Sequence, residues 1–155
     1  MNFGQMMLVI IAVVLFTTII MGLQRRMVSQ IVMATNNVYN TQALKVSDYI
    51  FQRLEADLIS GQIDFAELRT RWTTTEQSGA ALNPATFNVV AAGENPRAFQ
   101  LMDVDYFPRV RIVTTANPNI VTVEVRLEVH VPGQEPRFIG TLEHPFTKPF
   151  SNLNL

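Results

Sequence analysis

Two histidines are the side chains in this sequence best suited to acid–base or metal chemistry, and neither has a partner at a useful spacing. His130 follows Glu124, Arg126 and Glu128 in a run of period two, and His144 directly precedes a proline. A metal site needs further His, Cys or carboxylate ligands at characteristic spacings, and neither histidine has them. We therefore expect both histidines to be solvated surface residues. The alternating charges are expected to form ordinary cross-strand pairs.

Other catalytic chemistry is no better supported. The chain has no cysteine, which excludes disulfides, thiolate catalysis and Cys-ligated metals. No G-x-S-x-G, P-loop or dinucleotide-binding fingerprint occurs. The 12 basic and 13 acidic residues give a net charge of −1, without the basic footprint of a nucleic-acid-binding protein. We expect no enzymatic activity, no cofactor, no small-molecule substrate and no nucleic-acid partner, so the function must lie in assembly or binding.

An apolar segment near the N-terminus dominates the sequence. Residues 6–23, MMLVIIAVVLFTTIIMGL, contain no charged side chain. As a helix rising ~1.5 Å per residue, this segment is about 27 Å long, close to the ~30 Å hydrocarbon thickness of a bilayer. Eleven of its eighteen residues are Leu, Ile, Val or Phe, which together contribute on the order of −3 to −7 kcal/mol to insertion. The segment is therefore predicted to be stable in lipid.

Two other interpretations of this segment fit less well. A cleaved secretory signal has a basic start and an A-x-A-like cleavage site, whereas residues 1–5 carry no basic side chain and residues 23–26 (LQRR) offer no such site. A core helix of a soluble protein is disfavoured by the position at the terminus and by the lack of charge. We expect the segment to be retained as a membrane-spanning helix.

The helical pattern continues beyond this segment. Residues 24–60 contain neither proline nor glycine, and apolar residues recur mostly at three- and four-residue steps, as in an amphipathic helix. Gly61 is a predicted C-terminal stop. We predict one helix from near Met1 to about Ser60, and Gly22, which costs ~1 kcal/mol relative to alanine in a helix, is its predicted flexible point. The predicted parts are a hydrophobic transmembrane or filament-core helix (1–24), its amphipathic continuation (25–60) and a C-terminal globular head (61–155).

The first part of the head is predicted to be mixed. Asp64 and Glu67 resemble a capping box that opens a short helix over residues 65–72. Residues 73–84 are polar and small, which predicts a surface loop. Residues 86–92 are predicted to form a strand.

The C-terminal part is predicted to be β-structure. Residues 120–131 alternate strictly between Val or Leu and polar side chains, as in a half-buried antiparallel strand. Predicted strands at 109–115 and 137–143 flank it across short Pro/Gly/Asn connections, and the tail 145–155 is expected to be an extended surface segment. The predicted fold class is α+β. It has a long N-terminal helix, apolar in its first half and amphipathic in its second, packed on a small antiparallel sheet of three to four strands.

This arrangement resembles the type IV pilin superfamily, which includes pilins and secretion pseudopilins. The N-terminal stretch MNFGQMMLVIIAVVLFTTII looks like a processed pilin N-terminus. Gln5 stands where the family usually has a glutamate whose carboxylate pairs with the terminal amine of a neighbouring subunit. An amide can hydrogen-bond there but cannot neutralise the charge. Gly22 stands near where many pilin helices carry a proline, and the cysteine pair of many pilins is absent.

The resemblance implies a structural subunit of an extracellular type IV pilus-like filament. Such a subunit polymerises with copies of itself, as a helical homopolymer, through its hydrophobic N-terminal helix, and it serves adhesion, secretion or a related role. It lies in the inner membrane before assembly and in a cell-surface filament afterwards. The alternative is a single-pass membrane-anchored pseudopilin or accessory subunit of an envelope secretion complex. Arg25 and Arg26 favour a cytoplasmic head by the positive-inside tendency, and removal of a basic leader by a prepilin peptidase would reverse that orientation.

We expect the assembly interface to lie on the first twenty residues of the helix, where identical helices can approach closely. The expected contact residues are Met1, Phe3, Gln5, Met6, Val9, Ile10, Val13, Phe16 and Ile20.

Overall fold

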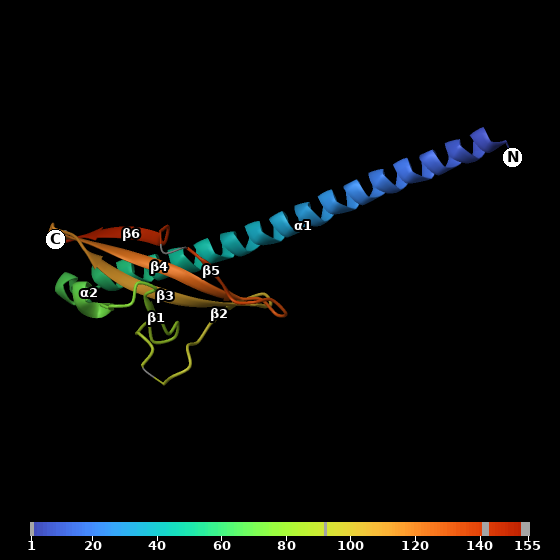
Figure 1. The fold of residues 1–155 in the computed structure, drawn as a ribbon. Helices are drawn as coiled ribbons and strands as arrows, with labels where there is room; N and C mark the ends of the chain where they lie inside the picture. The colour runs from blue at the N-terminus through green and yellow to red at the C-terminus, as the bar shows by residue number, and fades with distance from the viewer. Residues whose placement is uncertain (1, 92, 141–142, 153–155) are drawn as a thin grey trace. The chain divides into compact units, whose positions relative to one another are not determined.

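The structure, a computed structural model, describes residues 2–91, 93–140 and 143–152. Within these ranges there are two helices and six strands (Figure 1). The helices are α1 (Phe3–Ile59) and α2 (Phe65–Arg71), and the strands are β1 (Ala80–Ala81), β2 (Phe99–Leu101), β3 (Val104–Thr114), β4 (Ile120–His130), β5 (Arg137–Ile139) and β6 (Phe146–Ser151). The chain divides into two compact units, Met1–Tyr39 and Asn40–Leu155. The predicted α+β class is confirmed.

In the first unit α1 begins with a local set of hydrogen bonds. The main-chain oxygen of Asn2 accepts from the N–H groups of Gln5 at 2.9 Å and Met6 at 3.2 Å. Gln5 Oε1 accepts in turn from the N–H of Asn2 at 3.4 Å. The bond from Asn2 to the Gln5 side chain is one of the two side-chain bonds of a capping box, the one in which the third helical residue reaches back to the cap. It explains why the helix is already formed at Phe3.

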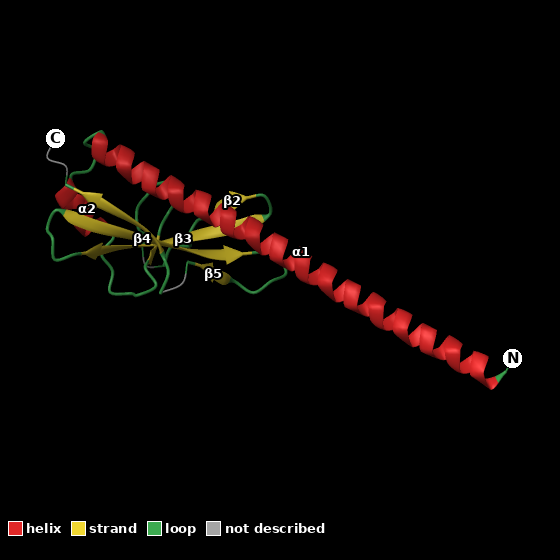
Figure 2. Cartoon of the chain, turned by 90° about the horizontal axis from the view of Figure 1, so that it is seen from above, coloured by secondary structure: helices red, strands yellow, loops and turns green. Residues whose placement is uncertain are grey.

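In the second unit, residues 40–59 of α1 lie along one face of the sheet (Figure 2). Their buried apolar side chains recur at helical spacing, as predicted for the amphipathic half. They are Ala43, Val46, Ile50, Phe51 and Leu54. Polar contacts add to this packing, because the Tyr106 hydroxyl of β3 donates to Gln42 Oε1 at 2.5 Å. The helix therefore covers the apolar face of the sheet.

Local signals determine how α1 ends and how α2 begins. α1 ends at Ile59, and Gly61 follows with a φ of +70°, a conformation that glycine adopts at little cost. Asp64 then caps α2, its side chain accepting from the N–H of Glu67 at 2.6 Å. Both predicted helices are confirmed to within two residues, because their boundaries depend on side chains close in sequence.

Two long antiparallel strands form the centre of the sheet. β3 and β4 pair continuously from Asp105↔His130 to Thr114↔Val121. The far side of β3 pairs with β1 and β2, and the far side of β4 pairs with β5 and β6. Each outer edge is therefore divided between two short strands. Along β4 the predicted alternation is confirmed by five side chains with no exposed surface, namely Val121, Val123, Val125, Leu127 and Val129.

The strand predicted at 109–115 in fact begins five residues earlier and runs through a proline. Pro108 has no N–H, but its main-chain oxygen accepts from the N–H of Leu82 at 2.9 Å. In a strand the N and O of one residue point to the same side, so the nitrogen of Pro108 faces away from β4. The proline therefore removes no hydrogen bond from the central β3–β4 pair.

The predicted number of strands was too small, because short edge strands were missed. The tail expected to be an extended surface segment contains β6, which pairs with β4 and buries Phe150. Pro149 is tolerated there because the strand lies at an edge. The expected loop 73–84 contains β1, and β2 was not predicted.

Two strand predictions were too long. The strand expected at 86–92 is wrong for its described residues 86–91, which contain only a bridge from Val89 to Leu82. The strand expected at 137–143 ends at Ile139. Residues 92 and 141–142 of these two predictions lie outside the described residues.

A close backbone approach at Gly79 gives a testable prediction. Gly79 has a φ of +83°, and a Cβ built there would lie 3.0 Å from the main-chain oxygen of Val110. Gly61 has a similar φ of +70°, with nothing within 4 Å of its Cβ position. We expect Gly79→Ala to lower the free energy of unfolding by about 2–3 kcal/mol and Gly61→Ala by only about 1 kcal/mol. Urea unfolding of the full chain in detergent, followed by circular dichroism, measures both, and equal losses would contradict the steric argument.

Candidate functional site

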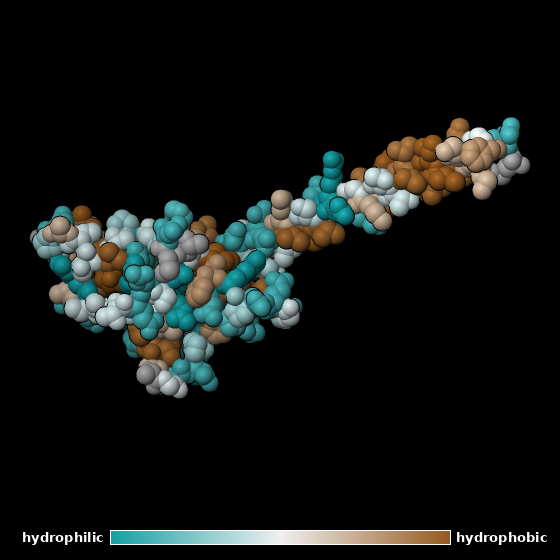
Figure 3. Space-filling view, in the orientation of Figure 1, coloured by the Kyte–Doolittle hydropathy of each residue, from teal (hydrophilic) through white to brown (hydrophobic). Residues whose placement is uncertain are grey.

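The first unit carries a long, uncovered apolar surface. All residues from Asn2 to Ala34 are exposed in the isolated chain, and hydrophobic residues gather on the N-terminal part of α1 (Figure 3). The apolar residues of the predicted interface are exposed by between 37% for Ile20 and 78% for Phe3. These are Phe3, Met6, Val9, Ile10, Val13, Phe16 and Ile20. Met1, the first predicted contact residue, lies outside the described residues.

This surface has the chemistry of a lipid-facing or helix-facing segment. The Thr17 and Thr18 hydroxyls donate to the main-chain oxygens of Val13 and Val14, both at 2.8 Å, so neither hydroxyl proton needs water. Among the described residues, α1 is the one helix long and apolar enough to cross a membrane, and none of its apolar window is buried. By length and composition this helix could therefore anchor the chain in a membrane.

The structure shows the local contacts of Gln5 and Gly22, the two other residues singled out in the N-terminal helix. Gln5 Oε1 already accepts a hydrogen bond from Asn2 of its own chain, which the sequence did not predict. Gly22 lies inside the continuous helix α1, and a Cβ built there would meet nothing within 4 Å. The flexibility expected at Gly22 stays a prediction.

The second unit has a ladder of charges on the sheet face opposite α1. Arg111 Nε and Nη2 donate to Glu124 Oε2 at 2.9 and 2.6 Å, and Arg109 donates to Glu128 at 3.2 and 3.3 Å. The predicted cross-strand charge pairing is therefore confirmed for Glu124 and Glu128, but not for Arg126, which lies opposite Arg109. His130 Nε2 lies 3.0 Å from Glu128 Oε1. Burial alone would raise the pKa of Glu128, but its hydrogen bonds with His130 and Arg109 outweigh burial and hold that pKa below its usual range.

Arg126 is the residue of this ladder whose surroundings the sequence did not reveal. It lies directly opposite Arg109 in the sheet and is only 8% exposed. Burial and then the charges of Arg109 and Arg111 lower its pKa. Two contacts compensate: Nε donates to the main-chain oxygen of Gly140 at 2.9 Å, and the guanidinium lies 4.6 Å from the Phe138 ring centre, a cation–π contact. Arg126 is thus part of the structure of the head.

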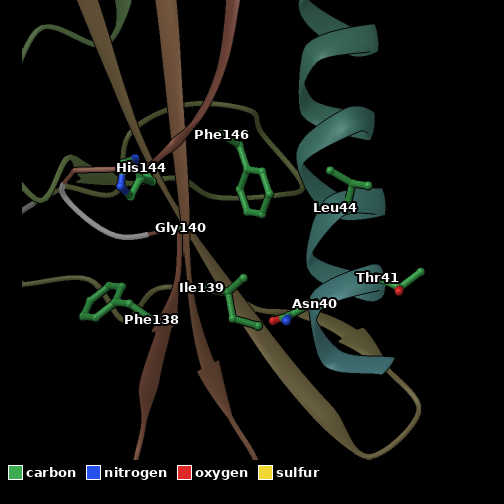
Figure 4. A pocket seen from close by; sticks show the side chains of 8 residues that line it. All are labelled: Asn40, Thr41, Leu44, Phe138, Ile139, Gly140, His144 and Phe146. Atoms are coloured by element: carbon green, nitrogen blue, oxygen red, sulfur yellow. The ribbon is translucent and has the colours of Figure 1, made fainter. Parts of the chain in front are cut away.

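A shallow depression of about 540 Å³ lies between α1 and the β5–β6 region within the second unit. Ile139, Phe146 and Asn40 lie between the strands and the helix, whereas Phe138 and His144 lie on the other side of the strands (Figure 4). The remaining lining residues are Thr41, Leu44 and Gly140. None of the lining residues is an Asp, Glu, Lys or Arg. Across the described residues, no group of three His, Cys, Asp or Glu side chains could hold a metal ion.

Comparison with known proteins gives no relative. No protein-family model, curated protein or solved structure matches the chain. The features of the chain that bear on its function are the apolar surface of residues 3–23 and the head that follows it in the chain.

Proposed function

We propose that the chain is a structural subunit of an extracellular filament of the type IV pilus kind, polymerising through its hydrophobic N-terminal helix. The observation that carries this proposal is the complete exposure of an uncharged helix of bilayer length in a chain that also has a packed head. Burying one large aliphatic or aromatic side chain contributes about 1.5–3 kcal/mol. Eleven such side chains lie in residues 6–23, so leaving the segment in water costs on the order of 15 kcal/mol or more.

Two environments relieve that cost. One is the bilayer, where the segment matches the hydrocarbon thickness. The other is a bundle of identical helices, whose surfaces are equally apolar and whose hydroxyls are satisfied within each helix. A subunit that moves from the first environment to the second needs no change in its helix. In the filament, the heads would form the outer shell and the helices the core.

A membrane-anchored pseudopilin or accessory subunit is the second candidate, and Gln5 favours it. The amide at this position is neutral, and its oxygen already accepts from Asn2 within the same chain. A neighbouring subunit's terminal amine would have to compete for that oxygen and would find no countercharge there. In this alternative the helix stays in the inner membrane, and the head binds a partner in the envelope.

Electron microscopy of material sheared from cells distinguishes the two candidates. We expect long fibres in the sheared fraction, with this chain identified in them by mass spectrometry and by antibody labelling along their length. The control is an otherwise identical strain that does not make the chain, which should lack these fibres. If the chain stays in the membrane fraction and no fibre contains it, the filament proposal is wrong and the anchored subunit is favoured.

A further inference from the structure

Two adjacent arginines are the only charged side chains in the first part of α1. Arg25 and Arg26 follow the apolar segment after one intervening residue, and residues 1–24 and 27–44 contain no Asp, Glu, Lys or Arg. A hydrophilic patch accordingly interrupts the hydrophobic surface of α1 (Figure 3). The two positive charges therefore stand at the boundary between the bilayer-length segment and the rest of the helix.

No acidic side chain on this part of the helix neutralises the two arginines. Charged partners along a helix lie three or four residues apart. For Arg25 and Arg26 these positions hold only uncharged residues, namely Met21, Gly22, Leu23, Val28, Ser29 and Gln30. The first acidic residue of the chain is Asp48, which lies about 33 Å farther along α1 than Arg26. Neither arginine takes part in an ion pair among the described residues.

Helix geometry directs both arginines back toward the apolar segment. Long side chains in an α-helix point toward its N-terminus and cover the turn before their own Cα. In that turn Gly22 has no side chain, and a Cβ built there would meet nothing within 4 Å. A shallow depression of about 310 Å³ lies beside Arg25 and is also lined by Met21, Gln24 and Val28. The exposed guanidinium groups can therefore reach the level at which the apolar segment ends, which in a bilayer is the level of the lipid headgroups.

We infer that Arg25 and Arg26 bind the headgroup phosphates of anionic phospholipids in the membrane that holds α1. A guanidinium matches a phosphate group with two parallel N–H···O hydrogen bonds. A zwitterionic lipid offers the same phosphate, but its own ammonium group compensates the charge, so two unpaired arginines select a lipid with net negative charge. The inference rests on the proposed function only in that the first part of α1 lies in a membrane. It holds for a filament subunit and for an anchored subunit alike.

Energy transfer from the helix to labelled lipids measures this selection. The chain has no cysteine, so Ile19→Cys places a single donor fluorophore within the apolar segment. The full chain is reconstituted in mixed phosphatidylcholine and phosphatidylglycerol vesicles, with a trace of either lipid carrying an acceptor on its acyl chain. We expect phosphatidylglycerol to be enriched around the helix at least about fivefold over phosphatidylcholine, which is the effect of one basic residue at a membrane surface. Raising the salt from about 0.1 M to 1 M, which shortens the screening length from ~10 to ~3 Å, should lower the enrichment.

Two double variants, made in the same labelled chain, separate the position of the charges from their number. Arg25→Gln with Arg26→Gln should bring the two lipids to about equal amounts around the helix. Lys45→Gln with Arg53→Gln changes the net charge by the same amount, because these are the next two basic residues of α1. They lie about 30 and 40 Å beyond the arginine pair, so the enrichment should stay at the level of the unchanged chain.

Three results would overturn the inference. They are equal amounts of both lipids around the unchanged helix, enrichment that survives the loss of both arginines, and an equal loss in the Lys45 and Arg53 variant. Flotation with the vesicles is measured first, and a chain that does not float refutes the membrane placement and the inference together. Enrichment in vesicles without fibres on cells would refute only the filament. Fibres on cells without enrichment in vesicles would refute only the binding of anionic headgroups.

Discussion

Replacing Val13 with arginine should abolish filaments while leaving the head folded. Val13 lies in the middle of the uncharged segment and is exposed along the helix. An arginine at the centre of a membrane helix costs about 2.5–3.5 kcal/mol on the insertion scale, and in a bundle of apolar helices its charge would be buried without a partner. We expect no fibres in the sheared fraction and a chain that is retained poorly by membranes. Immunoblotting of both fractions and electron microscopy measure these outcomes.

Ser29→Arg is the matched control for this variant. It adds the same side chain to the same helix at an exposed polar position outside the apolar segment, so fibres should form normally. Both variants should show the same thermal unfolding of the head, because neither residue belongs to the second unit. Normal fibres from Val13→Arg would show that the apolar segment is not the assembly surface.

Replacing Trp72 with alanine should destabilise the head by about 3–5 kcal/mol. Trp72 is among the largest fully buried side chains, and its ring packs edge-on against Phe87 with 5.5 Å between ring centres. Its main-chain oxygen also accepts from the N–H of Ile112 of β3 at 3.4 Å. Removing the indole leaves a cavity where α2, the following loop and the sheet meet. Urea unfolding of the full chain in detergent, followed by circular dichroism, measures the loss.

A second variant, Trp72→Phe, separates the effect of the indole N–H from the effect of the ring volume. The indole Nε1 is buried and has no hydrogen-bond partner among the described residues, and a buried donor left unpaired costs about 1–3 kcal/mol. Phenylalanine removes that donor while keeping much of the ring volume. We expect a loss of less than about 1.5 kcal/mol. A loss as large as that of Trp72→Ala would mean that the indole N–H has a partner in solution.

The parts of the fold that depend on local signals were predictable. The Asp64 cap, the Gly61 stop and the alternation along β4 each arise from residues within one turn or one strand. The short strands β1, β2 and β6 were not predictable, since each is two to six residues long and is stabilised by a partner strand elsewhere in the chain. Two strands were mispredicted because they contain a proline, Pro108 in β3 and Pro149 in β6. Each proline lacks an N–H, but it stands at a position where the sheet needs no hydrogen bond from that nitrogen.

The candidate site, like the fold, could be predicted from the sequence only in part. Exposure of Phe3, Val13 and Phe16 follows from an apolar run at the start of a chain, so the candidate surface was visible in the sequence. The hydrogen bond from Asn2 to the Gln5 side chain depends on precise backbone geometry, and the contact of Arg126 with the Phe138 ring depends on strand register. Those contacts cannot be deduced from composition or spacing alone.

The divided edges of the sheet limit how heads can meet when many are crowded together. A long open strand is a template on which a second sheet can grow, and proteins at high local concentration must avoid such templates. Here each border consists of two brief strands with a break between them, and β6 carries Pro149. The sheet edges therefore offer neighbouring heads no continuous row of main-chain N–H and C=O groups on which strands could add repeatedly. Growth of the proposed filament would therefore depend on contacts between its helices and not on strand addition between its heads.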